Sequence, residues 1–340
     1  MVRIEQNVIL KDYTTLQVGG PAEYFAVVTS EKELDEAVGH AQQEGLAVTV
    51  LGGGSNMLVS DEGVDGLVVK MDINPELVQE AGEGTVLVTA GAGMEFDDLV
   101  ARSVQQGLWG LENLSHIPGS VGATPVQNVG AYGVEVKDVI THVRVYDTLA
   151  RKFEVFTASE CQFGYRDSFF KTPEGKHYVI VSVTYRLCQD PLPKLIYKDL
   201  AALFEGTKPA LSEIRDAVIE IRSKKFPNWK TVGTAGSFFK NPIILREQFV
   251  KLQEQYPEMP YYEVDATRVK IPLAWILDKV LYLKGEGTTK VGQYAGQALV
   301  LINKGAATAT EIAEHANSLT AKVKEKTGID VQWEVTKIGF

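Results

Sequence analysis

The chain has 340 residues, a balanced composition and a formal net charge of −10. This length exceeds the size at which one hydrophobic core usually stops growing, so we expect two or three domains. The negative charge argues against nucleic-acid binding and against a role at a membrane surface, and an anionic ligand would therefore need a local basic patch.

Residues 1–74 are predicted to form a first region that leads into a glycine-rich loop. Apolar alternation predicts strands at residues 24–28, 47–51 and 67–70. Ser30 and Glu33 make a capping box for a helix that ends near Gly45. The second strand runs directly into the sequence GGGSN at residues 52–56. The opening residues carry charges among their apolar side chains, so we expect no signal peptide.

Residues 75–225 are predicted to form a second region. Strands are expected at 85–90, 139–147, 152–157 and 178–187, and helices at 95–106, 198–205 and 212–225. Residues 73–84, ahead of the first of these strands, indicate a connector or a hairpin. The segment 107–133 has six glycines, two prolines and little periodicity. A loop of that length inside a compact domain usually has a function.

Residues 226–327 are predicted to form a third region. Helices are expected at 246–256, 272–281 and 309–326. Thr308 and Glu311 make a capping box for the last of them. The apolar stretch 271–283 is interrupted by charges and is too short to span a membrane, so we expect no membrane insertion; the low cysteine count leads us to expect a reducing, cytoplasmic location. The alternating ending, 328–340, is expected to return to the second region as a strand.

The cysteines and histidines indicate neither a disulfide framework nor a metal centre. Cys161 and Cys188 are the two cysteines, and their spacing matches no zinc or redox motif. Of the five histidines, His116 alone lies in a candidate site. It has no further ligand at the spacing that a metal site requires, so we expect no metal.

Two glycine-rich strips could let a phosphate group approach the backbone closely. GGGSN follows a strand, and its amides can donate hydrogen bonds together with Ser55 and Asn56. It matches neither the Walker loop nor the G-x-G-x-x-G fingerprint, and a tight glycine turn is an equally good interpretation. The second strip, 117–133, has almost no charge. Each strip alone could be structural, but the pair favours a dinucleotide that is not bound as in a Rossmann fold.

Three polar residues lie in segments that do not look like core elements. Arg166, in FGYRDS, could hold a carboxylate with both arms of its guanidinium; the alternative is a surface ion pair with Asp167. Ser237, in GSFF, could protonate a carbanion, and no G-x-S-x-G motif surrounds it. Glu334 could act as an acid if half buried, although a solvent-facing strand position is the commoner role of such a residue.

Basic residues concentrate in the third region of this acidic chain. They are Lys224, Lys225, Lys230, Lys240, Arg268, Lys270 and Lys284. Such a patch could hold an anionic ligand. A solvated surface of mixed charge is the alternative for at least half of them.

Taken together, these motifs resemble those of one family. The matching stretches are LGGGSN, GLENLSHIPGSVGATPVQNVGAYGVE, CQFGYRDSFFK, GSFFKNP, QALVLIN and the final WEV. In their order the chain is similar, nearly end to end, to the UDP-N-acetylenolpyruvoylglucosamine reductases, the MurB flavoenzymes of bacterial peptidoglycan precursor synthesis. The segment IYKDL, with Tyr197, looks like the tyrosine loop of the family's first structural class.

The resemblance implies an α+β fold of three domains. Residues 1–74 and 75–225, with 328–340 returning, would form a FAD-binding unit of the vanillyl-alcohol-oxidase type, and 226–327 an α+β substrate-binding domain. The resemblance also implies non-covalent FAD, NADPH as co-substrate, and reduction of UDP-N-acetylglucosamine enolpyruvate to UDP-N-acetylmuramate. We expect a monomer.

The same resemblance assigns roles to single residues. The catalytic positions are Arg166, Ser237 and Glu334. The cofactor-binding positions are Leu51, Gly52, Gly53, Gly54, Ser55, Asn56, Ile117, Pro118, Gly119, Thr124 and Gly130. The substrate-binding positions are Tyr132, Tyr197, Lys225, Asn241, Lys284 and Gln297. Thr336 stands where the family has an arginine near the flavin.

Two other functions stay open at this point. A flavoprotein oxidase could act on an alcohol or a lactone and pass electrons to oxygen, and such relatives often tether the flavin through histidine. A non-catalytic UDP-sugar-binding flavoprotein is the second alternative, against which the three catalytic positions argue. Release of the flavin on denaturation tests the first, and NADPH oxidation in the presence of substrate tests the second.

Overall fold

The computed structural model describes residues 2–340 and has an α+β fold, as the sequence predicts. The chain divides into two compact units, each with a hydrophobic core of its own. Unit 1 comprises the described residues up to Val8 together with Ala22–Gly54 and Val64–Ser223. Unit 2 comprises Ile9–Pro21, Ser55–Gly63 and Lys224–Phe340.

The first sheet of unit 1 positions the glycine-rich loop. Its four strands lie in the order β1 (Glu5–Ile9), β2 (Pro21–Val28), β5 (Val64–Met71) and β3 (Val48–Leu51). β2 and β3 both run parallel to β5. Between β2 and β3, helix α1 (Glu31–Glu44) begins where Ser30 accepts a hydrogen bond from the Glu33 amide and ends at Gly45 (φ 69°). The predicted strand–helix–strand unit is confirmed, and β3 ends where the glycine-rich loop begins.

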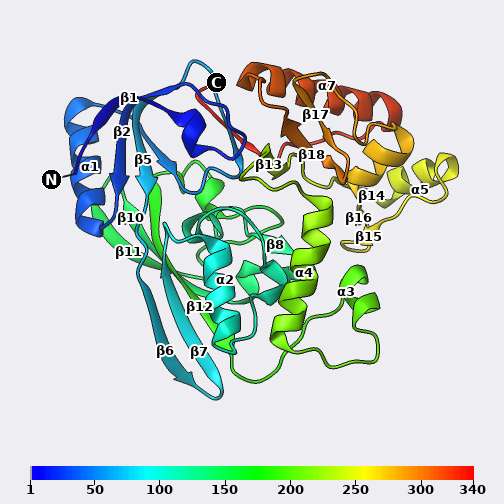
Figure 1. Ribbon diagram of the computed structural model, residues 1–340, viewed down its shortest axis with the longest axis horizontal. Coiled ribbons are helices and arrows are strands. Elements are labelled where there is room, and N and C mark those ends of the chain that lie inside the picture. Colours follow the sequence, from blue (N-terminus) through cyan, green and yellow to red (C-terminus); the bar gives the residue numbers. More distant parts are fainter. Residues whose placement is uncertain (1) are drawn as a thin grey trace. The chain divides into compact units, whose positions relative to one another are not determined.

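The second sheet of unit 1 is antiparallel. In spatial order its strands are β11 (Lys152–Thr157), β10 (Ile140–Asp147), β12 (Tyr178–Cys188), β7 (Thr85–Gly91) and β6 (Glu76–Gly82). β6 and β7 form the hairpin seen in Figure 1, so residues 73–84 contain a strand and are not a mere connector. The helices are α2 (Phe96–Gln105), α3 (Lys198–Leu203) and α4 (Leu211–Lys225).

A hydrogen-bonded network joins α1 to β10. The fully buried Tyr146 donates its hydroxyl to Asp35, and Arg151 donates to both oxygens of the same carboxylate. Burial and the neighbouring Asp35 raise the pKa of Tyr146 to about 12, so the phenol keeps its proton over the physiological range. The network fixes α1 against the second sheet.

Unit 2 includes two small antiparallel sheets and three α-helices. The sheets have the orders β13 (Gly233–Ser237), β18 (Gln297–Asn303), β17 (Val291–Tyr294) and β14 (Ile243–Leu245), β16 (Arg268–Lys270), β15 (Tyr262–Glu263). The helices are α5 (Arg246–Gln255), α6 (Leu273–Trp275) and α7 (Ala309–Thr327). α7 begins with the predicted capping box of Thr308 and Glu311. Asp61 also accepts hydrogen bonds from the amides of Ala309 and Thr310.

Two segments differ from the sequence prediction. The single helix expected at 272–281 is the short α6, which continues as a π-helix over Ile276–Val280. The terminal strand, expected to rejoin residues 75–225, is β19 (Thr336–Ile338) and pairs in parallel with β4 (Met57–Val59). Alternation indicates which side chains of a strand are buried, but it does not identify the partner strand. The domain boundaries near 74 and 225 stay predictions.

No helix in the described part of the chain combines the length and the apolar character that crossing a bilayer requires.

Candidate functional site

The two glycine-rich strips meet in unit 1. A Cβ atom built on Gly53 would lie 2.6 Å from the Cα of Gly119, and one built on Gly52 would lie 2.5 Å from the Oγ of Ser120. The neighbour of Gly53 is backbone, so that position requires glycine, whereas at Gly52 a side chain would displace the Ser120 hydroxyl. The buried Leu51 ends β3 just before them. Two segments that are far apart in sequence thus lie in direct contact.

Ser120 adds a polar group beside these glycines. Its side chain is 3% exposed, and among the residues the structure describes its hydroxyl finds no hydrogen-bond partner. Leaving a buried hydroxyl unpaired costs about 1–3 kcal/mol unless a ligand supplies the partner. Glycine amides next to a buried hydroxyl suit the oxygens of a phosphate or the polar edge of a ring, so these residues fit FAD. Ser120 lies within the second strip but is not among the residues predicted from the sequence.

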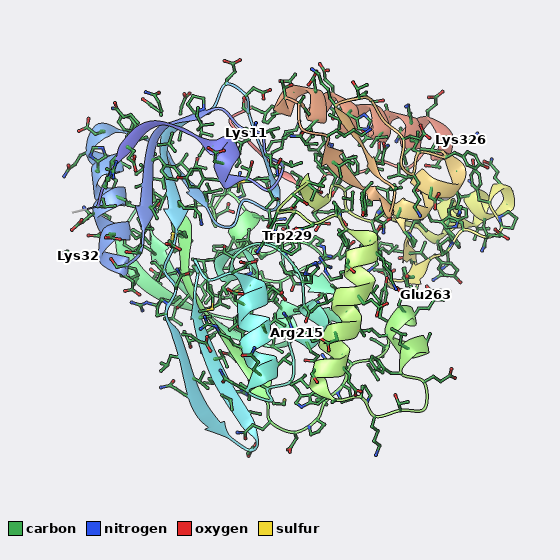
Figure 2. All side chains as sticks on the ribbon, viewed as in Figure 1. Lys11, Lys32, Arg215, Trp229, Glu263 and Lys326 are labelled. Atoms are coloured by element: carbon green, nitrogen blue, oxygen red, sulfur yellow. The ribbon has the colours of Figure 1, made fainter. Side chains whose placement is uncertain are left out.

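The second strip is anchored at its start by charged side chains of α2 and α4. The amide of His116 (φ 60°) donates to Asp97 (2.6 Å), and its carbonyl accepts from the buried Arg222 (2.9 Å). Arg215, labelled in Figure 2, donates to both oxygens of Asp97. Burial acts to raise the pKa of Asp97, but these hydrogen bonds outweigh it and hold the pKa below its usual value. The strip therefore starts from a fixed point.

Residues 107–133 are more ordered than their composition predicts. They contain 3-10 helices at Glu112–Leu114 and Val121–Ala123 and the strand β8 (Gly130–Ala131), which pairs with β9 (Val134–Glu135). The buried Thr124 bonds through its hydroxyl to the Val121 carbonyl (2.8 Å) and to the Tyr185 hydroxyl (2.8 Å). The other predicted cofactor positions of this strip, Ile117, Pro118 and Gly130, are half-buried.

Arg166 lies in a tight turn of unit 1. Its backbone is left-handed (φ 52°), and Gly164 and Asp167 pair across the turn. The guanidinium donates to the carbonyl of Gly130 (2.8 Å), and Lys171 donates to the Arg166 carbonyl (3.0 Å). A strained backbone that directs a charged side chain to the second glycine-rich strip, which contains Gly130, is typical of a functional position.

Tyr132 and Tyr197, two of the predicted substrate positions, pack together in unit 1. Their ring centroids are 5.0 Å apart with an interplanar angle of 78°, which is an edge-to-face contact. Tyr132 is buried and has a left-handed backbone (φ 49°), and Tyr197 is the residue before α3. The structure therefore brings these two predicted residues together.

Ser237 and Glu334 belong to unit 2, where hydrogen bonds link their neighbourhoods. Ser237 ends β13, and the carbonyl of the next residue, Phe238, accepts from the Glu334 amide (2.9 Å). The Glu334 carbonyl in turn accepts from the side chain of Asn56 (3.1 Å). Glu334 is half-buried and lies just before β19, so it is not within the terminal strand as the sequence predicts. The structure thus connects two predicted catalytic residues and one predicted cofactor residue.

The four remaining predicted substrate residues also lie in unit 2. Asn241 accepts a hydrogen bond from the Leu273 amide (2.9 Å) and so fixes the start of α6. Gln297 begins β18, next to Gly296, where a Cβ atom would lie 2.4 Å from the Lys224 carbonyl. Lys225 is the last residue of α4, and Lys284 lies after the π-helix. Ser55 also lies in unit 2, whereas Gly54 (φ 63°) ends a segment of unit 1.

Within residues 2–340, no three histidine, cysteine, aspartate or glutamate side chains gather in a way that could hold a metal ion.

Two family models match the chain. One, described as FAD binding domain, matches residues 22–151, and the other, described as UDP-N-acetylenolpyruvoylglucosamine reductase, C-terminal domain, matches residues 227–338. The UDP-N-acetylenolpyruvoylglucosamine reductase of Flavobacterium johnsoniae is 37% identical, covering 99% of this chain and 100% of that protein. The reductase of the same name from Thermobifida fusca is 39% identical, covering 98% of each. The crystal structure of the reductase from Thermus caldophilus aligns with a TM-score of 0.70 at 26% identity, over 99% of this chain and 100% of that one.

Proposed function

Because the chain belongs to the family of UDP-N-acetylenolpyruvoylglucosamine reductases, which are FAD-dependent oxidoreductases, we propose that it reduces UDP-N-acetylglucosamine enolpyruvate to UDP-N-acetylmuramate. NADPH is the proposed electron source, and the product is a peptidoglycan precursor. The observation that carries the proposal is the meeting of two glycine-rich strips beside the buried Ser120 hydroxyl, in a chain that matches this family over its full length. NADPH oxidation that depends on the enolpyruvyl substrate would test it.

The strip residues of unit 1 would hold the cofactor. The amides of Gly52, Gly53 and Gly119 would donate hydrogen bonds to the cofactor, and Ser120 offers a hydroxyl, while a side chain at Gly53 would collide with the backbone of Gly119. When bound, FAD would accept two electrons from NADPH and supply hydride from its N5 atom to the terminal enol carbon of the substrate.

Three side chains would manage the remaining charge and the proton. The permanent positive charge of Arg166 would stabilise negative charge on the substrate carboxylate, and Glu334 would stabilise the same enolic form. Ser237 would give its hydroxyl proton to the neighbouring carbon, so that a C–H bond forms as the O–H bond breaks. The Glu334 amide donates to the carbonyl of Phe238, the residue after Ser237. This backbone hydrogen bond supports a shared task for Ser237 and Glu334.

We expect substrate binding to depend on two lysines of unit 2. Lys225→Ala and Lys284→Ala should each raise the KM for the UDP-sugar by roughly two- to tenfold, because each removes one charge that would face a diphosphate. The KM for NADPH should change less. Steady-state kinetics at low and high salt would measure both values, and added salt should weaken wild-type substrate binding as well.

Lys326→Ala is the matched control. Lys326, labelled in Figure 2, is exposed near the end of α7, so its replacement removes the same charge away from the predicted substrate positions. Equal effects of Lys225→Ala on both Michaelis constants, or an equal effect of the control, would contradict the assignment.

We expect FAD to be bound without a covalent bond. Burial raises the pKa of the Cys161 thiol to about 12, which leaves almost no reactive thiolate near neutral pH. Of the five histidines, His116 alone lies in a candidate site, so it is the position at which a tether would be sought. The purified protein should be yellow and should release its flavin into the supernatant when it is denatured and precipitated. Colour that stays with the precipitated chain would favour a tethered flavin, as in the oxidase alternative.

A further inference from the structure

Asn128 lies in the second glycine-rich strip and joins it to the turn that carries Arg166. Its side chain is fully buried, and its Nδ2 donates to the carbonyl of Gly164 (2.9 Å) and to the Oε2 of Glu135 (3.0 Å). Its Oδ1 accepts from the amide of Lys137 (3.2 Å). One carboxamide therefore uses both of its hydrogens and its oxygen to link the strip to two later segments of unit 1.

Two more side chains cross between the strip and this turn. The Ser168 hydroxyl donates to the carbonyl of Val126 (2.6 Å), and the Arg166 guanidinium donates to the carbonyl of Gly130 (2.8 Å). A Cβ atom built on Gly130 would lie 3.3 Å from the Nη1 of Arg166, so the two residues are close neighbours. Positions 126, 128 and 130 of the strip thus each form a hydrogen bond with the turn.

The turn needs this support because its backbone is strained. Arg166 is left-handed (φ 52°), a conformation that a residue other than glycine adopts at a cost. Across the turn, the Gly164 amide donates to the Asp167 carbonyl at 2.9 Å, but the return bond from the Asp167 amide to the Gly164 carbonyl is long, at 3.4 Å. The bond from Asn128 to that same carbonyl is shorter, at 2.9 Å. A strained backbone persists where the surrounding structure over-determines it, and Asn128 supplies part of that constraint.

Asn128 is suited to holding other groups and not to touching a substrate. Its backbone is left-handed (φ 45°), which asparagine adopts more readily than most residues. Its side chain is fully buried, and its amide hydrogens and its oxygen bond to groups of the protein. Any effect of this residue on the chemistry therefore passes through the groups that it holds.

We propose that Asn128 is a positioning residue that fixes the turn at residues 164–168 and thereby directs the Arg166 guanidinium. What Arg166 does to the substrate rests on the proposed function; the holding of the turn does not. When the bond from Asn128 is lost, the turn samples other conformations, and the guanidinium spends less time in its productive position. A small misplacement of a catalytic group can slow a reaction strongly.

Two variants remove this bond and still suit a left-handed backbone. Asn128→Asp keeps the size of the side chain, but at neutral pH it has no hydrogen to donate and sets a carboxylate against that of Glu135. Asn128→Gly removes the side chain and accepts positive φ without strain. Hydrogen exchange of the holoenzyme, followed by mass spectrometry, should show the amides of Gly164 and Asp167 exchanging roughly five- to a hundredfold faster in both variants than in the wild type.

Asn303 provides the matched control. It is a buried asparagine of unit 2 whose Nδ2 donates to the carbonyls of Leu16 (3.0 Å) and Gln17 (3.4 Å) and whose Oδ1 accepts from the Gly305 amide (2.8 Å). Asn303→Asp should lose a comparable pair of donor bonds without changing exchange at residues 164–168. Faster exchange confined to that turn indicates its release, whereas faster exchange throughout the chain indicates global unfolding.

The two half-reactions test whether Asn128 acts through Arg166. In Asn128→Asp, reduction of the flavin by NADPH should stay near normal, and reoxidation by the enolpyruvyl substrate should slow by roughly ten- to a hundredfold. In an Arg166→Ala background, the same change should slow reoxidation little further, because the group that it positions is gone. Additive losses in this double-mutant cycle would contradict the proposal.

Equal exchange at residues 164–168 in the wild type and both Asn128 variants would overturn the proposal. Rapid exchange of the Gly164 and Asp167 amides in the wild type would overturn it without any variant, so the test does not depend on whether the variants fold. If these amides exchange faster in the variants but reoxidation keeps its wild-type rate, the holding of the turn stands and the proposed role of Arg166 fails.

Discussion

Replacing Ser237 with alanine should leave reduction of the bound flavin by NADPH near its normal rate and slow its reoxidation by the enolpyruvyl substrate by roughly 10²–10⁴-fold. The two half-reactions separate because the first needs no proton on the substrate carbon and the second does. The structure places Ser237 at the end of β13, after Gly236 (φ 70°) and before the buried Phe238 and Phe239, so the change removes a hydroxyl without disturbing the core.

Stopped-flow absorbance of the flavin would follow both steps. Ser237→Cys, which keeps a transferable proton, should retain more activity than Ser237→Ala. A Ser237→Ala enzyme that is reoxidised at the wild-type rate would falsify the role of this residue. Slowing of both half-reactions to the same extent would instead indicate damage to the flavin site.

Gly53→Ala should weaken FAD binding. The new Cβ atom would lie 2.6 Å from the Cα of Gly119, where the neighbour is backbone and cannot rotate away. Forcing the strips apart should cost roughly 1–3 kcal/mol, which corresponds to about 5- to 150-fold in Kd. Titration of the apoprotein with FAD, followed by quenching of flavin fluorescence, would measure the change.

Gly164→Ala is the matched control for this experiment. A Cβ atom on Gly164 would have Asp167 at an ordinary 3.5 Å as its neighbour, and the residue is not among those with positive φ. The control should therefore bind FAD with nearly wild-type affinity. If the two variants bind FAD equally well, the contact between the strips does not form the cofactor site.

Local signals predicted much of the fold because they act over a few residues. Ser30 and Gly45 identify the two ends of α1, and Thr308 with Glu311 identifies the start of α7. The predicted partner of the terminal strand was wrong. Alternation along Thr336–Ile338 indicates which side chains are buried but does not identify the distant strand with which β19 pairs. The π-helix after α6 was missed because its apolar spacing is compatible with an ordinary helix.

The candidate site was predictable where a motif carries its own chemistry and not where a contact is long-range. The glycine strips were found from composition, but that Gly53 touches Gly119 appears only in three dimensions. Ser120 is important because its buried hydroxyl has no hydrogen-bond partner among the described residues, and the sequence gives no measure of burial. The roles of Arg166, Ser237 and Glu334 come from family resemblance and remain proposals.

The pairing of β19 with β4 has a consequence for biosynthesis. Unit 2 is assembled from three separate stretches, and its parallel strands join Met57 to Thr336. A ribosome would therefore have to deliver almost the whole chain before this sheet could form, whereas the last segment of unit 1 ends at Ser223. Since domains tend to fold as they emerge from the ribosome, the backbone groups of β4 would stay unpaired until β19 has been synthesised. During that interval the nascent chain would present an open strand edge, the kind of surface that molecular chaperones protect from aggregation.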